Sequence, residues 1–302
     1  MAAAFNSDAA LGKAWLESLE HQRRLSRHTL ANYARAIGLL FRLKENIALR
    51  ELDALQLRRF VARLHAEGLS GRTLALTLSA WRGLFNWLAR HRGFAANQAQ
   101  GVRAPKSPRL LPKALSVEQV QQLLEAPAGG TPESLRDRAM FELLYSSGLR
   151  LAEIVALDAD DGRLDLKQGE VTVTGKGAKT RSVPVGSRAR EALRDWLKAR
   201  AQLASPAERA LFVGARGRRI APGTVQARLR GWSKRQGLGA GVHPHMLRHS
   251  FASHVLQSSQ DLRAVQEMLG HASISSTQVY THLDFQALAK VYDAAHPRAR
   301  KK

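Results

Sequence analysis

The chain has 302 residues, 44% hydrophobic and 24% charged, and its 47 Lys and Arg residues against 25 Asp and Glu residues give a formal charge of +22. This length is typical of two domains, and the composition excludes a disordered, collagen-like or coiled-coil chain. The lack of cysteine excludes disulfides, thiolate metal sites and a cysteine nucleophile, and it suits a reducing environment.

The positive charge indicates a polyanionic partner, because so large a net charge opposes compaction unless a partner neutralises it. Residues 1–103 contain 16 Lys and Arg against 7 Asp and Glu, and residues 104–302 contain 31 against 18. We therefore expect nucleic acid to contact both parts, although a ribosomal-type protein or a merely highly charged surface fits the charge as well. The sequence shows neither a signal-peptide pattern nor a membrane-spanning apolar run, so we expect a soluble, cytoplasmic protein.

The first hundred residues predict a helical domain, residues 1–103. Ser26 and Ser70 are suitable caps for two helices. Apolar residues follow each cap at three- and four-residue steps, which predicts a core face on each helix: Leu30, Tyr33, Ile37 and Leu40 after the first cap, and Leu74, Leu78, Trp81, Leu84 and Phe85 after the second. Residues 104–113 are rich in proline and basic residues, which breaks both helix and strand patterns and predicts a linker.

Residues 114–302 predict a second domain that is mainly α with a small β-hairpin sheet. Ser116 with Gln119 forms a capping-box pattern, and Thr131 with Pro132 marks another helix start. The alternating runs 170–174 and 180–185 predict the two strands of a hairpin.

Two candidate functional residues lie beside glycines, one at a predicted helix end and one at the tip of the predicted hairpin. Arg150 follows a glycine at a helix end, and Glu153 lies one turn later, where it can hold the guanidinium group. Lys176 lies between two glycines at the hairpin tip and can reach into a ligand cleft. A surface ion pair and a solvated turn are the ordinary alternatives. The glycine spacing around Lys176 does not match a nucleotide-binding phosphate loop.

Two further candidates lie toward the C-terminal end. His245, Arg248 and His249 have the spacing of one helical face, but Met246 stands where a zinc protease helix would have its glutamate, so zinc binding is disfavoured. His271 follows Gly270 at a predicted helix end, and Tyr280 comes nine residues after His271. The other tyrosines lie on apolar stripes and are interpreted as packing residues: Tyr33, Tyr145 and Tyr292.

These residue types suggest phosphoryl transfer without a metal ion. Arg150 and Arg248 can bind the extra negative charge that develops when a DNA phosphodiester is attacked. A tyrosine hydroxyl can be the nucleophile if cations and a histidine favour its phenolate, and a lysine can protonate the departing sugar oxygen. No carboxylate cluster suited to magnesium stands out, so we expect neither a metal nor a cofactor.

In this order the residues resemble the active-site pattern of the tyrosine recombinase (phage integrase) family. That pattern is Arg, Lys, His-x-x-Arg, His and Tyr, and it falls here on Arg150, Lys176, His245, Arg248, His271 and Tyr280. The segment LSRHTLANYARAI is also similar to the helical core-binding domain of the family, so the resemblance spans nearly the whole chain. It implies the two-domain recombinase fold, a 3′-phosphotyrosine intermediate on Tyr280, and supporting roles for Glu153 and His249.

The length and the tail also resemble the Xer subfamily, of the C type more than the D type. This implies two copies assembled with two copies of a XerD-like recombinase on dif-like double-stranded DNA, under an FtsK-like translocase, to resolve chromosome dimers during cell division. A D-type or phage or integron integrase, a DNA-binding protein without catalysis and a type IB topoisomerase remain alternatives. The last predicted helix, with Phe285, Leu288, Val291 and Tyr292, either docks on a neighbouring protomer or packs on its own domain.

Overall fold

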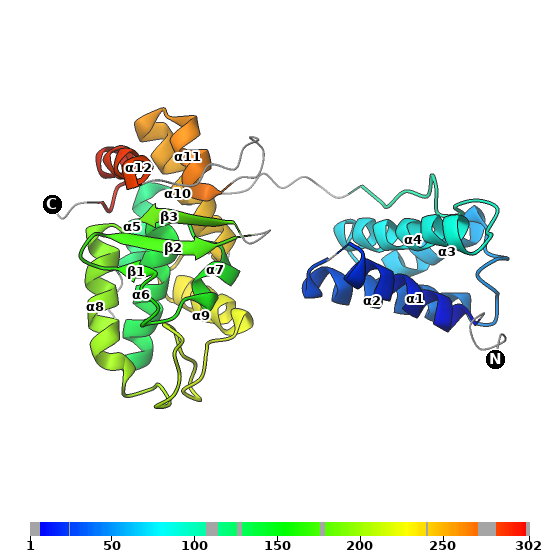
Figure 1. Cartoon of the computed structure of the whole chain (residues 1–302), viewed down its shortest axis with the longest axis horizontal. Helices are drawn as coiled ribbons and strands as arrows, with labels where there is room; N and C mark the ends of the chain where they lie inside the picture. The colour runs from blue at the N-terminus through cyan, green and yellow to red at the C-terminus, as the bar shows by residue number, and fades with distance from the viewer. Residues whose placement is uncertain are drawn as a thin grey trace. The chain divides into compact units, whose positions relative to one another are not determined.

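The structure is a computed structural model that divides into two compact units, Met1–Arg109 and Leu110–Lys302 (Figure 1). It describes residues 7–23, 25–106, 114–125, 129–175, 179–239, 241–270 and 282–299, without the side chains of 282–287. Within these ranges, no helix is both long enough and apolar enough to cross a membrane.

The first unit is helical throughout its described elements. Its helices are α1 (Asp8–His21), α2 (Arg27–Lys44), α3 (Ala54–Ala66) and α4 (Gly71–His91). A side-chain oxygen accepts a hydrogen bond from the first turn of each helix, which satisfies a backbone N–H that has no partner within the helix; these caps are Ser7, Ser26, Asp53 and Ser70.

The core of the first unit forms where α1 and α2 pack against α4. The predicted face of α4 is buried from Leu74 to Phe85, as the spacing of its apolar residues requires. Trp81 is fully buried and donates from Nε1 to the carbonyl of Ala36 at 2.8 Å, so its polar edge also has a partner. Tyr33 stacks on Trp15, which confirms that this tyrosine is a packing residue.

The second unit combines helices with a small antiparallel sheet. Its helices are α5 (Val117–Leu124), α6 (Pro132–Ser146), α7 (Leu151–Ala156), α8 (Ser187–Arg200), α9 (Pro222–Arg235), α10 (Pro244–Ser259), α11 (Leu262–Leu269) and α12 (His282–Ala295). Its strands, in sheet order, are β1 (Leu164–Asp165), β2 (Glu170–Thr174) and β3 (Thr180–Pro184). Strand β1 has only two residues, too short for alternation to predict it from the sequence.

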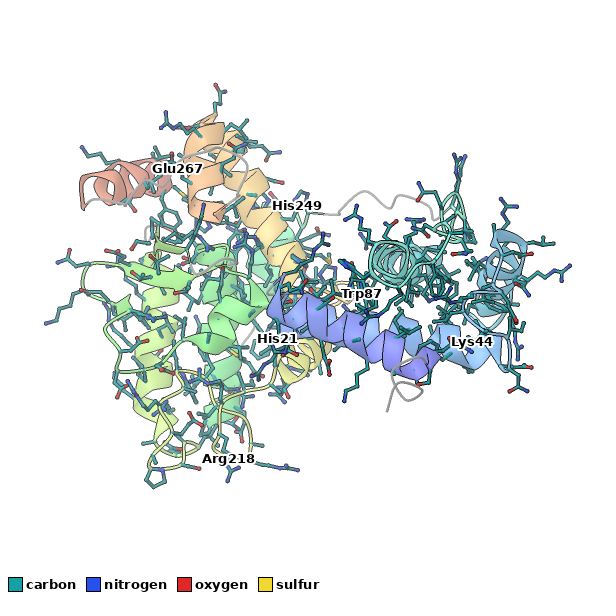
Figure 2. The ribbon with its side chains drawn as sticks, turned by 45° about the vertical axis from the view of Figure 1, so that its right-hand side comes forward. His21, Lys44, Trp87, Arg218, His249 and Glu267 are labelled. Atoms are coloured by element: carbon teal, nitrogen blue, oxygen red, sulfur yellow. The ribbon has the colours of Figure 1, made fainter. Side chains whose placement is uncertain are left out.

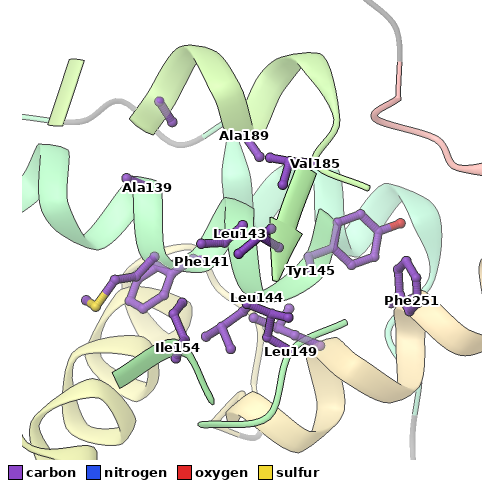
Figure 3. Close-up of a cluster of buried hydrophobic side chains, with 14 of the residues drawn as sticks. Ala139, Phe141, Leu143, Leu144, Tyr145, Leu149, Ile154, Val185, Ala189 and Phe251 are labelled. Carbon is purple, nitrogen blue, oxygen red and sulfur yellow. The ribbon is translucent and has the colours of Figure 1, made fainter. Parts of the chain in front are cut away.

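Helix α6 is the centre of the second unit. It is buried along nearly its whole length and packs against α5, α8, α9 and α10. Figure 3 shows Phe141, Leu144 and Tyr145 of α6 among the buried side chains around it. A helix that is buried on all sides gives its neighbours a fixed support, and two of the segments that build the candidate site, α7 and α10, pack on it.

The hairpin of β2 and β3 follows the predicted alternation, with one exception in residue type. Val171 pairs with Val183, and both side chains are buried. Val173 pairs with Arg181, which points into the same buried face two residues before Val183. A buried arginine at a position that alternation assigns to the core requires polar partners inside the protein.

The C-terminal segment packs on its own domain. Helix α12 lies against α10, α11 and β3 (Figure 1), and the Tyr292 hydroxyl hydrogen-bonds that of Ser146 at 2.6 Å. Beyond α12, Nε of the buried Arg298 donates to Oε2 of the buried Glu142 at 2.9 Å. These contacts favour the second of the two predictions for this helix, packing within its own chain.

Candidate active site at the end of helix α11

The segment between α6 and α7 places Arg150 beside Glu153. Gly148 has a φ of +56°, and a Cβ at this position would lie 2.4 Å from Cδ1 of Phe251, so glycine is required there. Arg150 then occupies the N-cap position of α7, and both its backbone N–H and its Nη1 donate to the Glu153 carboxylate at 2.8 Å. The contact predicted between these two side chains is therefore present.

Glu153 also binds a second arginine. Arg181 of β3 donates from Nη1 and Nη2 to the two carboxylate oxygens at 2.8 and 2.9 Å. Burial alone would raise the pKa of Glu153, but the hydrogen bonds and charges of Arg181 and Arg150 outweigh it and lower this pKa to about 2. The carboxylate is therefore ionised at neutral pH.

Arg248 of α10 is a further buried arginine, and it binds the turn before α7 and the end of α11. Its Nη1 donates to the carbonyl of Gly148 and its Nη2 to the carbonyl of Leu269, both at 2.5 Å. Burial, together with the charges of Arg150 and Arg181, lowers the pKa of Arg248 to about 10. The guanidinium therefore stays charged at neutral pH while it is held rigidly by backbone carbonyls.

Three arginines thus converge on the last carbonyls of α11. Arg181 Nε donates to Met268 at 2.8 Å, Arg248 to Leu269, and Arg150 Nη2 to Gly270 at 3.2 Å. The last carbonyls of a helix lack partners within the helix and carry a partial negative charge, so cations stabilise them. We call Arg150, Arg181, Arg248 and Glu153 the arginine cluster.

Two glycines that precede other predicted site residues, Gly175 and Gly270, also lie at the arginine cluster. A Cβ on Gly175, at the end of β2, would lie 3.5 Å from Oε1 of Glu153 and 3.6 Å from Nη1 of Arg150. Gly270 receives the hydrogen bond from Arg150 described above. These two glycines directly precede Lys176 and His271 in the sequence. Lys176, His271 and Tyr280 themselves lie outside the described residues.

The remaining predicted residues lie on α10. His245 is in its first turn, one turn before Arg248, and its side chain is exposed. His249 is exposed as well, and Figure 2 shows it on α10. The structure thus places His245 where it is open to a ligand beside a buried, fixed arginine.

Sequence analysis missed Arg181, which makes two hydrogen bonds to Glu153 and one to the end of α11. The signal was present, because alternation in the predicted strand 180–185 puts Arg181 on the face of the buried Val183. In the described part of the chain, no three His, Asp or Glu side chains are grouped so that they could hold a metal ion.

The chain belongs to the phage integrase family. Residues 113–287 match the description "Phage integrase family", and residues 13–92 match "Phage integrase, N-terminal SAM-like domain". The mainly helical fold with a small sheet, expected from the sequence, is confirmed. The chain is accordingly a site-specific recombinase of the tyrosine recombinase class.

Within that class the sequence is similar to Xer proteins. It is 55% identical to tyrosine recombinase XerC 1 of Ralstonia nicotianae, covering 96% of this chain and 94% of the relative. It is 54% identical to tyrosine recombinase XerC of Azotobacter vinelandii, covering 96% of each chain. The fold matches the XerH recombinase in a post-cleavage complex with a palindromic difH substrate, with a TM-score of 0.69, 24% identity and coverage of 95% of this chain and 84% of XerH.

Proposed function

We propose that this chain cuts and rejoins double-stranded DNA at dif-like sites through a 3′-phosphotyrosine intermediate on Tyr280. The observation that supports this most directly is the arginine cluster, where two predicted phosphate ligands, Arg150 and Arg248, lie at one helix end. In the family pattern this helix end is followed by His271 and then Tyr280. A cluster of fixed cations suits a phosphate whose negative charge increases during reaction.

The two arginines differ in exposure, which suggests different tasks. The Arg150 side chain is 35% exposed, and its described hydrogen bonds use one N–H of each terminal nitrogen. It therefore keeps N–H groups that can bind a phosphate oxygen directly. Arg248 is buried and held by backbone carbonyls, so it acts on the phosphate through its positive charge.

The chemical step follows from these roles. The Tyr280 oxygen forms a bond to phosphorus as the bond from phosphorus to the 5′ oxygen breaks. His245 or His271 takes the phenol proton, and Lys176 gives a proton to the leaving 5′ oxygen. In the second half, a 5′-hydroxyl of the partner duplex attacks the phosphotyrosine, so the phosphodiester bond energy is kept and no cofactor is consumed. Glu153 orients Arg150, and His249 supports the same helix face.

The wider assignment also rests on similarity to Xer proteins. Residues 1–103 form the core-binding domain and residues 114–302 the catalytic domain, joined by a linker at 104–113. Both domains contact the phosphate backbone, because both are basic. Two copies act with two copies of a XerD-like recombinase in the cytoplasm, and an FtsK-like translocase controls the exchange that resolves chromosome dimers.

Covalent trapping on a nicked dif-like duplex tests this function. The nick lets the short 5′-hydroxyl fragment diffuse away after cleavage, so the chain remains bonded to the DNA and can be detected after denaturation. We expect an adduct at Tyr280 for the wild type and for the matched Tyr33→Phe variant, because Tyr33 packs in the first unit. The Tyr280→Phe variant should bind the duplex with unchanged affinity and form no adduct. An adduct in that variant would remove Tyr280 as the nucleophile.

A further inference from the structure

Arg181 is a buried arginine that connects Glu153 to the end of α11. Its two terminal nitrogens bind both oxygens of Glu153, and its Nε binds the carbonyl of Met268. The side chain is only 4% exposed, so DNA bound at the surface cannot reach its guanidinium group. Arg181 therefore makes no direct contact with the DNA, and its hydrogen bonds link it to the site through the groups that it holds.

The first of these groups is Arg150, held through Glu153. Arg181 forms the paired, two-point contact with the carboxylate, so the Arg150 side chain makes one hydrogen bond to it from Nη1. The Nη2 of Arg150 is left to bind Gly270. Without Arg181, the carboxylate would be free to form the two-point contact with Arg150, which is the preferred geometry of this pair. Arg150 would then be neutralised where its charge is needed.

The second group is the end of α11. Gly270 has a φ of +62°, and a Cβ on it would lie 3.0 Å from Cδ and 3.2 Å from Nε of Arg181. Arg181 therefore supports the turn at Gly270 by close packing, as well as by its hydrogen bond to Met268. The chain continues from this turn into the segment with His271 and Tyr280.

We propose that Arg181 is a positioning residue for strand cleavage, which orients Arg150 through Glu153 and fixes the turn from which the segment with His271 and Tyr280 continues. This inference rests on the proposed function. It assigns Arg181 no contact with the DNA and no proton transfer. It predicts a defect in the cleavage step with little change in DNA affinity.

The test compares Arg181→Met with Arg298→Met in the full-length chain. Arg298 is the matched control, because it is also a buried arginine paired with a buried glutamate, Glu142, outside the arginine cluster. The readouts are the single-turnover rate constant for adduct formation on the nicked duplex and the dissociation constant for the same DNA. Each rate is measured on a normal scissile phosphodiester and on a methylphosphonate, which lacks one negative charge.

We expect Arg181→Met to react at least about tenfold more slowly than Arg298→Met on the phosphodiester, the loss typical of one oriented charged hydrogen bond. On the methylphosphonate the defect should shrink by about threefold or more, because less charge has to be stabilised. Equal rates for the two variants, or an equal defect on both substrates, would overturn the inference. If Arg181→Met does not fold, Arg181→Lys gives the same comparison, because lysine keeps the charge but lacks the two-point fork.

The outcome separates this inference from the proposed function. If the wild type forms no adduct on either substrate, the proposed function itself fails. If the wild type forms the adduct and Arg181→Met matches the Arg298→Met control, only the role of Arg181 fails.

Discussion

Glu153 is a buried carboxylate whose described hydrogen bonds all come from arginine residues. Burial of a lone carboxylate would be costly, and the two guanidinium groups reverse that cost. The pKa of Glu153 accordingly falls from 4.5 to about 2 although the group is buried. The folded protein thus depends on the charged form of this residue, while the unfolded chain binds a proton more readily.

This difference predicts a pH-dependent contribution of Glu153 to stability. A carboxyl group with a lowered pKa in the folded state stabilises it above the unfolded pKa, and this contribution is lost as the pH falls from about 4.5 to about 2. The full difference between the folded and unfolded pKa of Glu153 corresponds to about 3 kcal/mol of stability. We expect the gap in unfolding free energy between wild type and Glu153→Gln, measured by urea denaturation, to narrow over that range. A gap independent of pH would contradict the lowered pKa.

At the scale of residues, the sequence predicted the members of the cluster that belong to recognisable motifs. Arg150, Glu153 and Arg248 were identified in this way, and the contact of Arg150 with Glu153 is present as expected. Arg181 was not identified, because an arginine in a short strand is ordinarily solvated. Its partners come from α7 and α11, and spacing along one strand carries no information about contacts over such separations.

At the scale of elements, the candidate site is built from the ends of helices and strands. The start of α7, the end of β2 and the end of α11 meet at the arginine cluster. The sequence predicted β2, β3 and the starts of four of the described helices, α2, α4, α5 and α6, because caps and alternation are local signals. It did not predict which ends meet, since those contacts join residues about 30 to 120 positions apart.

A pair of glycines at helix ends tests whether the close contact between α11 and Arg181 matters. Gly270 and Gly237 follow α11 and α9 with φ values of +62° and +69°. Alanine at either position costs about 1–2 kcal/mol in this left-handed conformation. Only at Gly270 does the added Cβ also meet Arg181, since the space around Gly237 is open.

We therefore expect both alanine variants to lose similar backbone stability, with only Gly270→Ala slowing adduct formation on the nicked duplex. The slower reaction would follow from displacement of Arg181 and of the turn that it supports. Urea denaturation gives the stability of each variant, and single-turnover trapping gives the rate. If Gly237→Ala slowed the reaction as much as Gly270→Ala, the effect would be one of general stability and the close contact would be irrelevant.

At the scale of the whole molecule, charge is distributed over both units rather than confined to the candidate site. The two units contain separate hydrophobic cores, as the composition and the linker pattern predicted.

The sequence left two alternatives open for the last helix, because an apolar stripe does not reveal what covers it. In the structure the buried Tyr292 and Arg298 favour packing within the chain, with partners at Ser146 and Glu142.

The charge of +22 predicts that DNA binding depends steeply on salt. Lysine and arginine contacts to phosphates release condensed counterions, so affinity falls as a power of salt concentration set by the number of contacts. With six to ten such contacts, the association constant should fall about 10³–10⁵-fold between 50 and 200 mM salt. A filter-binding or fluorescence titration of the Tyr280→Phe variant measures this without covalent trapping. A random duplex of equal length should show a similar slope at lower affinity, because phosphate contacts carry no sequence information. A salt-independent affinity would mean that the basic surface does not face the DNA, and the proposed contact of both domains with the backbone would fail.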